Sequence, residues 1–131
     1  MPATIVVTVN ATVMIVEDDP TVRRLAHRIL ESAGYRVLAP ENTDEAISQA
    51  GHHPNPIHLV LADVVMPGLN GPELFARIAG HHPGARVLFM SGYTAEVVSR
   101  LGVLDQGARF IQKPFTLRGL LEQVSMALKA S

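Results

Sequence analysis

The chain has 131 residues, enough for one domain with a hydrophobic core of its own. Apolar residues make up 47% of it and charged residues 18%, which is typical of a soluble globular protein and excludes a disordered chain. The formal net charge of -1 argues against direct nucleic-acid binding, and the absence of cysteine excludes disulfides and thiolate chemistry. No apolar run could span a membrane and the N-terminus does not resemble a signal peptide, so we expect a cytoplasmic protein with no membrane partner.

Short apolar runs alternate with segments of helical spacing five times along the chain. The first predicted helix has Pro20 in its first turn and Gly34 just past its end. The second begins after Asn42, and Glu45 three residues later indicates a capping box. The predicted strands are 12–16, 36–39, 58–62, 86–90 and 108–112. The predicted helices are 20–32, one from 43, one from 71, 95–104 and 117–129.

This alternation predicts an α/β fold, a single doubly wound (βα)5 domain whose five-stranded parallel sheet carries helices on both faces. The run at 58–62 is almost continuously apolar, which favours a central strand buried on both sides. The predicted domain occupies residues 12–131. Residues 1–11 are not needed for it, although 4–9 have the composition of a strand and could form an extra edge strand or a dimer contact. We expect them instead to be an N-terminal extension, a linker or residues left from expression.

Five polar residues stand at or just after the ends of predicted strands: Glu17, Asp18, Asp63, Ser91 and Lys113. Because the carboxyl ends of parallel strands face one crevice, we expect these side chains to converge on one site. Three carboxylates cannot all stay ionised at close range without a cation, and hard oxygen ligands favour Mg²⁺. The charges balance, since Mg²⁺ and one lysine offset three carboxylates.

Asp63 is the predicted nucleophile, because a carboxylate at the end of a buried strand can attack a phosphoryl group and form an acyl phosphate. Lys113 would neutralise the phosphoryl oxygens as a point charge, and Ser91 would donate a hydrogen bond to one of them. Pro114 follows the lysine, and an X-Pro bond in a fixed turn can be cis and aim Lys113 inward. Taken alone, each residue also fits an ordinary turn or surface position, so the hypothesis rests on the combination.

The predicted metal ligands are Glu17, Asp18 and Asp63, with the backbone carbonyl of Val65 as a further oxygen. Asp19 is better interpreted as the N-cap of the first helix, because Pro20 follows it.

The sequence Ala-Gly-His-His-Pro occurs twice, at 50–54 and at 79–83. Both copies stand where a helix is expected to end, since glycine stops a helix and proline prevents its continuation. The histidine pairs are interpreted as loop residues, because no third metal ligand follows at a fixed spacing.

Four segments in order resemble the receiver (response-regulator) domain of bacterial two-component signalling, over about 12–130 of the chain. The resemblance implies the strand order 2-1-3-4-5. It implies that Asp63 accepts phosphate from a phosphohistidine on a histidine kinase or histidine phosphotransfer protein. It also implies a conformational switch through Ser91 and an aromatic residue on the fifth strand, here Phe110. The four segments are Val16-Glu17-Asp18-Asp19-Pro20, 61–71, Met90-Ser91-Gly92-Tyr93 and Lys113-Pro114-Phe115.

Three positions depart from other versions of the family. Phe110 lacks the hydroxyl that a tyrosine there would use to report the switch. Val65 and Tyr93 flank the site and cannot place a water as an acid or amide could, so slow self-dephosphorylation is expected. As an enzyme, the isolated domain would show at most self-phosphorylation and self-dephosphorylation.

The segments around Ser91 and Lys113 are most similar to receivers of hybrid sensor histidine kinases, so we expect a fragment of a larger kinase, with a stand-alone regulator still open. The face built from 95–104, 108–112 and 117–129 is the predicted contact for a partner or a homodimer.

Three other classes compete with this interpretation. A haloacid dehalogenase-type phosphatase would carry a second Asp two residues after its nucleophile, where Val65 stands. A flavodoxin-like flavin binder would need a first loop rich in Ser, Thr and Gly to cradle phosphate, whereas 17–20 reads Glu-Asp-Asp-Pro. A receiver used only as an interaction module, without phosphorylation, remains open.

Overall fold

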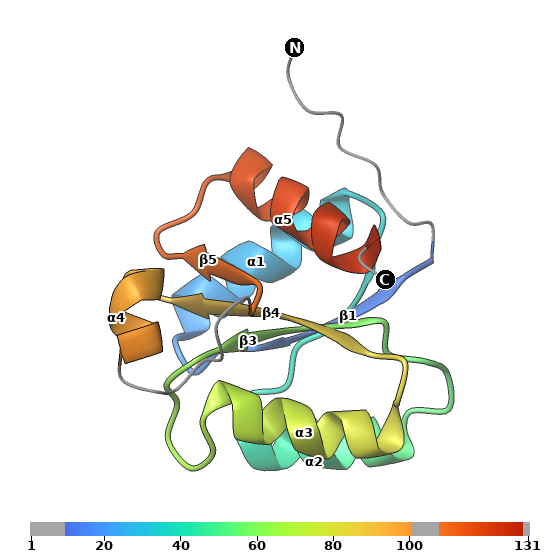
Figure 1. Ribbon diagram of the computed structural model, residues 1–131. Coiled ribbons are helices and arrows are strands. Elements are labelled where there is room, and N and C mark those ends of the chain that lie inside the picture. The colour runs from blue at the N-terminus through green and yellow to red at the C-terminus, as the bar shows by residue number, and fades with distance from the viewer. Residues whose placement is uncertain (1–9, 101–107, 130–131) are drawn as a thin grey trace.

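The computed structural model describes residues 10–100 and 108–129. Within them, strands and helices alternate along the chain (Figure 1). The strands are β1 (Thr12–Val16), β2 (Arg36–Leu38), β3 (Leu59–Asp63), β4 (Arg86–Ser91) and β5 (Phe110–Gln112). The helices are α1 (Pro20–Ser32), α2 (Thr43–His52), α3 (Gly71–His81), α4 (Ala95–Arg100) and α5 (Leu117–Lys129).

The strands form one parallel sheet in the order β2-β1-β3-β4-β5, which confirms the predicted α/β fold and strand order. The helices α1 and α5 cover one face of the sheet, and α2 and α3 cover the other (Figure 1). A hydrophobic core lies on each face. Leu30 and Leu120 belong to the core under α1 and α5, and Ala46 and Leu74 belong to the core under α2 and α3.

The central strand is buried along its whole length, because every residue of β3 has no more than 7% of its surface exposed. It runs from Leu59 to Asp63, one residue later than predicted. The predicted first residue, His58, lies just before the strand, where its amide donates to the Thr12 carbonyl (2.9 Å) and its ring Nδ1 accepts from the Thr12 amide (2.9 Å). The last residue, Asp63, pairs with Met90 of β4 and is therefore fixed by the sheet itself.

The other boundaries differ from prediction by small shifts. β2 ends at Leu38, β4 continues to Ser91 because Ser91 pairs with Gln112, and β5 begins at Phe110. The structure has α4 over Ala95–Arg100, and the rest of its predicted range lies outside the described residues.

Side-chain caps fix the starts of the helices. Asp19 accepts from the Thr21 amide (2.9 Å) at the start of α1, as predicted. Asn42 caps α2 through the Glu45 amide (2.8 Å), but the Glu45 carboxylate accepts from Gln49 within the helix rather than completing a capping box. A full capping box forms at α3.

No helix within residues 10–100 and 108–129 has the length and apolar character needed to cross a membrane.

Candidate functional site

The carboxyl ends of β1 and β3 bring three carboxylates together. Val16 pairs with Ala62 in the parallel register, so Glu17 and Asp63 follow at the same edge of the sheet. Glu17 is 2% exposed and Asp63 is 7% exposed, whereas Asp18 is exposed. One carboxylate oxygen from each of these three residues lies within 4.8 Å of the others. The convergence expected for these residues is therefore present in the fold.

Lys113 reaches this cluster from the loop after β5. Its Nζ donates to Glu17 Oε2 (2.8 Å) and to Asp63 Oδ2 (3.2 Å). The Lys113 amide donates to the carbonyl of Ser91 (2.8 Å), which extends the pairing of β4 and β5 beyond the strands. The Lys113–Pro114 peptide bond is cis. The side chain is thus held at the site by main-chain contacts and by two carboxylates.

The cluster carries more negative charge than one lysine offsets. Burial raises the pKa of Glu17 to about 7, and the charge of Asp63 acts in the same direction against the lowering effect of the hydrogen bond from Lys113. Burial acts to lower the pKa of Lys113, but its hydrogen bond with Glu17 and the charge of Asp63 outweigh that effect and raise it. A further cation beside Glu17 would therefore stabilise its ionised form.

The chemistry of the donor set fits Mg²⁺. The cluster offers carboxylate oxygens and no nitrogen or sulfur ligand, which suits a hard divalent ion. Asp18, the exposed member, leaves one side of the cluster open to water, and Mg²⁺ usually keeps several water ligands. Glu17, Asp18 and Asp63 are the residues whose carboxylates could hold it.

Ser91 closes β4 beside this cluster, since its neighbour Met90 pairs with Asp63. It is 2% exposed, and its Oγ accepts from the Tyr93 amide (3.0 Å). Val65 and Tyr93 are 57% and 60% exposed, so apolar and aromatic side chains flank the opening of the site.

Phe110 lies at the start of β5, opposite Phe89 and away from Lys113 at the other end of that strand. It is half-buried and packs against the core under α2 and α3. The structure thus places Phe110 in the core rather than among the charged groups.

Gly71 packs against the main chain of Asp63, a contact that was not predicted. A Cβ at this position would lie 2.6 Å from the Asp63 carbonyl oxygen and 3.1 Å from the Phe89 ring. The Gly71 amide also donates to the Val64 carbonyl (2.8 Å). The first turn of α3 therefore packs directly on the main chain of Asp63, and only glycine allows this approach.

An apolar depression adjoins Lys113. It has a volume of about 320 Å³ and lies between α1 and the loop after β5. Leu25 on its wall is 48% exposed. The lining residues are Asp19, Val22, Leu25, Lys113, Pro114 and Phe115.

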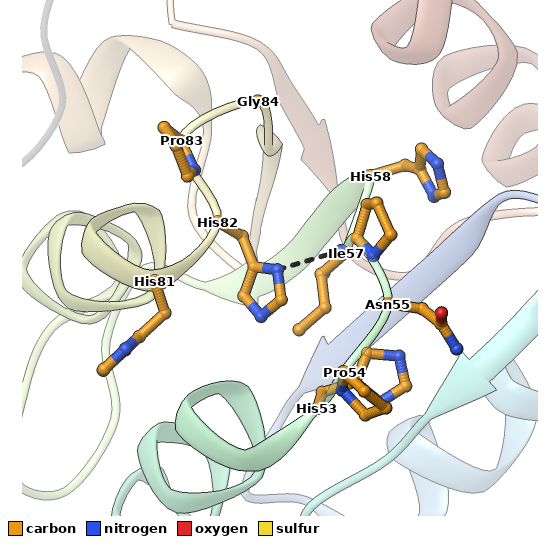
Figure 2. A pocket seen from close by; sticks show the side chains of 10 residues that line it. His53, Pro54, Asn55, Ile57, His58, His81, His82, Pro83 and Gly84 are labelled. Carbon is orange, nitrogen blue, oxygen red and sulfur yellow. Dashed lines mark hydrogen bonds between the residues drawn. The ribbon is translucent and has the colours of Figure 1, made fainter.

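A second cavity, of about 460 Å³, lies at the opposite end of the sheet, where both Ala-Gly-His-His-Pro segments meet (Figure 2). His82 donates from Nε2 to the Ala50 carbonyl (2.8 Å) and accepts at Nδ1 from the Ile57 amide (3.3 Å). His58 likewise accepts at Nδ1 from the Thr12 amide. These two rings tie helix ends and strand starts together.

The sequence matches the response regulator receiver domain family over residues 13–125. The chain belongs to this family. It is a receiver domain of two-component signalling, and receiver domains interact with histidine kinases or phosphotransfer proteins.

Two curated relatives and one solved structure illustrate the match. The chain is 34% identical over 120 residues to the sensor kinase CckA of Brucella abortus (strain 2308), covering 92% of this chain but 13% of that protein. It is 31% identical over 119 residues to the response regulator receiver protein CpdR of the same strain, covering 91% of this chain and 98% of that protein. The crystal structure of the receiver domain from the hybrid histidine kinase CckA superposes with a TM-score of 0.76 at 34% identity, covering 91% of this chain and 100% of that one.

Proposed function

We propose that this receiver domain is a phosphoacceptor switch in which Asp63 takes a phosphoryl group from a phosphohistidine on a histidine kinase or phosphotransfer protein. One observation carries the proposal: a buried carboxylate at the end of the central strand lies 3.2 Å from a lysine ammonium and within 4.8 Å of two further carboxylates. Positioning and charge stabilisation are most of what phosphoryl transfer requires of a protein.

In the proposed reaction an Asp63 carboxylate oxygen attacks phosphorus while the bond from phosphorus to the donor imidazole nitrogen breaks. The electron pair of that bond returns to the imidazole, and Asp63 is left as an acyl phosphate. Lys113 is close enough to exchange its contact with Asp63 for one with a phosphoryl oxygen. Ser91 Oγ already accepts from the Tyr93 amide, so its own proton is available for donation to the phosphoryl group.

Glu17, Asp18, Asp63 and the carbonyl of Val65 are proposed to hold Mg²⁺. When bound, the ion would offset the charge of the phosphoryl oxygens that develops during transfer. Glu17 and Asp18 would then be ionised metal ligands, and Glu17 would lose the proton that burial favours in the metal-free protein.

The donor is proposed to dock on the depression beside Lys113. A phosphohistidine must approach Asp63 from the open side of the site, and the depression beside Lys113 offers apolar surface from the exposed Leu25 and the partly buried Phe115. Burial of this surface against a partner would be favourable and would exclude water from the reacting groups.

The kind of protein that contains this domain is proposed from its relatives. Similarity to a sensor kinase and to the receiver of a hybrid histidine kinase supports an origin in such a kinase, acting in the cytoplasm. A stand-alone regulator is the alternative that similarity to CpdR supports. In either case residues 12–131 would be the receiver domain and 1–11 an extension or linker.

Phosphorylation is proposed to switch the face formed by α4, β5 and α5, through Ser91 and Phe110, and so to control a partner or homodimer contact. Leu117 and Met126 on α5 are 60% and 52% exposed, which supplies apolar surface for such a contact. Sedimentation of the phosphorylated and unphosphorylated protein tests the homodimer, and an unchanged monomer in both states would contradict it.

The phosphoacceptor proposal is tested by intact mass after incubation with Mg²⁺ and acetyl phosphate. Wild-type protein should gain one phosphate, and the gain should disappear with a chelator or with Asp63→Asn. No gain from acetyl phosphate or from a phosphohistidine donor would favour the alternative, a receiver that acts as an interaction module without phosphorylation.

A further inference from the structure

The loop between β1 and α1 is fixed by hydrogen bonds on both sides of Asp18. Glu17 Oε1 accepts from the Asp19 amide (3.1 Å), and the Asp19 carboxylate accepts from the Thr21 amide (2.9 Å). The carbonyl of Asp19 accepts from the Arg23 amide (2.9 Å). The carboxylate of Asp18 has no hydrogen-bond partner in the part of the chain that the structure describes, so it is the one acidic side chain of this loop left unbonded.

Arg23 adds a second tie to the same loop through its side chain. Its guanidinium Nη1 donates to the main-chain carbonyl of Glu17 (3.0 Å). The amide and the side chain of Arg23 thus hold the carbonyls of Asp19 and Glu17, the two residues that flank Asp18. Although its guanidinium contacts the main chain of Glu17, Arg23 forms no ion pair within 4.0 Å with a carboxylate of the described residues.

This choice of partner has a physical consequence. A guanidinium paired with Asp18 or Glu17 would occupy oxygens that a cation needs. A guanidinium bound to the carbonyl of Glu17 instead restrains the backbone and adds no contact of its own to the carboxylate oxygens.

We propose that Arg23 is a positioning residue for the cation site, holding the Glu17–Asp19 loop so that the Asp18 and Glu17 carboxylates face one ion. The inference rests on the proposed Mg²⁺ site. Two effects of removing Arg23 have opposite signs. Loss of its positive charge would strengthen the binding of a cation, whereas loss of its bond to the Glu17 carbonyl would release the loop and weaken binding.

The test compares Arg23→Met with Arg24→Met, which removes the same charge from the next residue. Arg24 is exposed and has no partner among the described residues. Mg²⁺ affinity is measured by calorimetry, and hydrogen exchange of the Asp19 amide is measured in the metal-free protein. Arg23→Met should weaken Mg²⁺ binding by about three- to tenfold and speed exchange at Asp19, whereas Arg24→Met should bind Mg²⁺ as tightly as wild type or slightly more tightly.

Arg23→Lys should recover part of the affinity, because an ammonium can still donate to the Glu17 carbonyl. A merely structural role would lower the melting temperature of the variants without this order of Mg²⁺ affinities. Equal or tighter Mg²⁺ binding by Arg23→Met would overturn the inference while leaving the proposed function intact. If wild-type protein bound no Mg²⁺, the proposed metal site would be wrong, and unchanged exchange at Asp19 in Arg23→Met would overturn the loop restraint separately.

Discussion

Mg²⁺ binding is expected to weaken as the pH falls below 7, because a proton and the cation compete for Glu17. Burial raises the pKa of this carboxyl to about 7, so it is half protonated near neutral pH in the metal-free protein. A cation that needs the ionised carboxylate loses affinity in proportion to the protonated fraction. The dissociation constant for Mg²⁺ should therefore be about tenfold higher at pH 6 than at pH 8, and nearly constant above pH 8.

The assay is a calorimetric titration with Mg²⁺ at several pH values between 6 and 8. Glu17→Gln should bind Mg²⁺ more weakly and without this pH dependence, since the competing proton is gone. Glu31→Gln is the matched control, because Glu31 is exposed near the end of α1 and pairs with His27 (3.3 Å) away from the site. A wild-type dissociation constant that stays the same from pH 8 to pH 6 would refute the reasoning.

The raised pKa of Glu17 also predicts how the stability of the metal-free protein changes with pH. The pKa of Glu17 is raised from 4.5 to about 7, so between these values the folded state binds more protons than the unfolded state. The contribution of Glu17 to the free energy of unfolding should therefore fall as the pH rises from about 4.5 to about 7. Denaturant titrations of wild-type protein and Glu17→Gln check this, and an equal pH slope in both would contradict it.

Three further predictions concern the surroundings of Asp63. Gly71→Ala should destabilise the fold by about 1 to 3 kcal/mol and slow phosphorylation, because its methyl group would lie 2.6 Å from the Asp63 carbonyl oxygen. Gly80→Ala, with nothing within 4 Å, is the control for a denaturant titration and should be neutral or stabilising. Leu25→Asn should slow transfer from the phosphohistidine partner but not labelling by acetyl phosphate, and equal slowing of both would argue against docking there. The phosphorylated domain should lose its phosphate slowly and Val65→Asn should lose it faster, whereas a wild-type half-life of seconds would contradict the role given to the exposed valine.

The fold could be predicted from the sequence because the apolar runs, the helical spacing and the residues at helix ends all indicate the same strands and helices. The continuous apolar run of β3 requires burial on both faces, and the α1 periodicity, together with Asp19, Pro20 and Gly34, fixes that helix at both ends. Strand ends were less certain. His58 lies one residue before β3, yet its amide donates to the Thr12 carbonyl and its carbonyl accepts from the Arg86 amide.

The sequence predicted that Glu17, Asp18, Asp63 and Lys113 would lie together, but it did not predict their contacts. Parallel topology alone brings Glu17, Asp63 and Lys113 to one edge of the sheet. Which carboxylates Lys113 contacts in the absence of phosphate depends on distances that no sequence pattern contains. The contacts of Gly71 with the Asp63 carbonyl and of Arg23 with the Glu17 carbonyl were not predicted either. A main-chain carbonyl is present in every residue, so no sequence pattern indicates which one a side chain will contact.

The most direct test of the account is to locate the phosphate. Protein treated with acetyl phosphate and Mg²⁺ is reduced with borohydride, which converts an aspartyl phosphate to homoserine, and is then sequenced by tandem mass spectrometry. The account predicts homoserine at position 63 alone, and none in protein treated with a chelator. Homoserine at Asp18 instead, or phosphate retained on a serine or histidine with Asp63 unmodified, would contradict it.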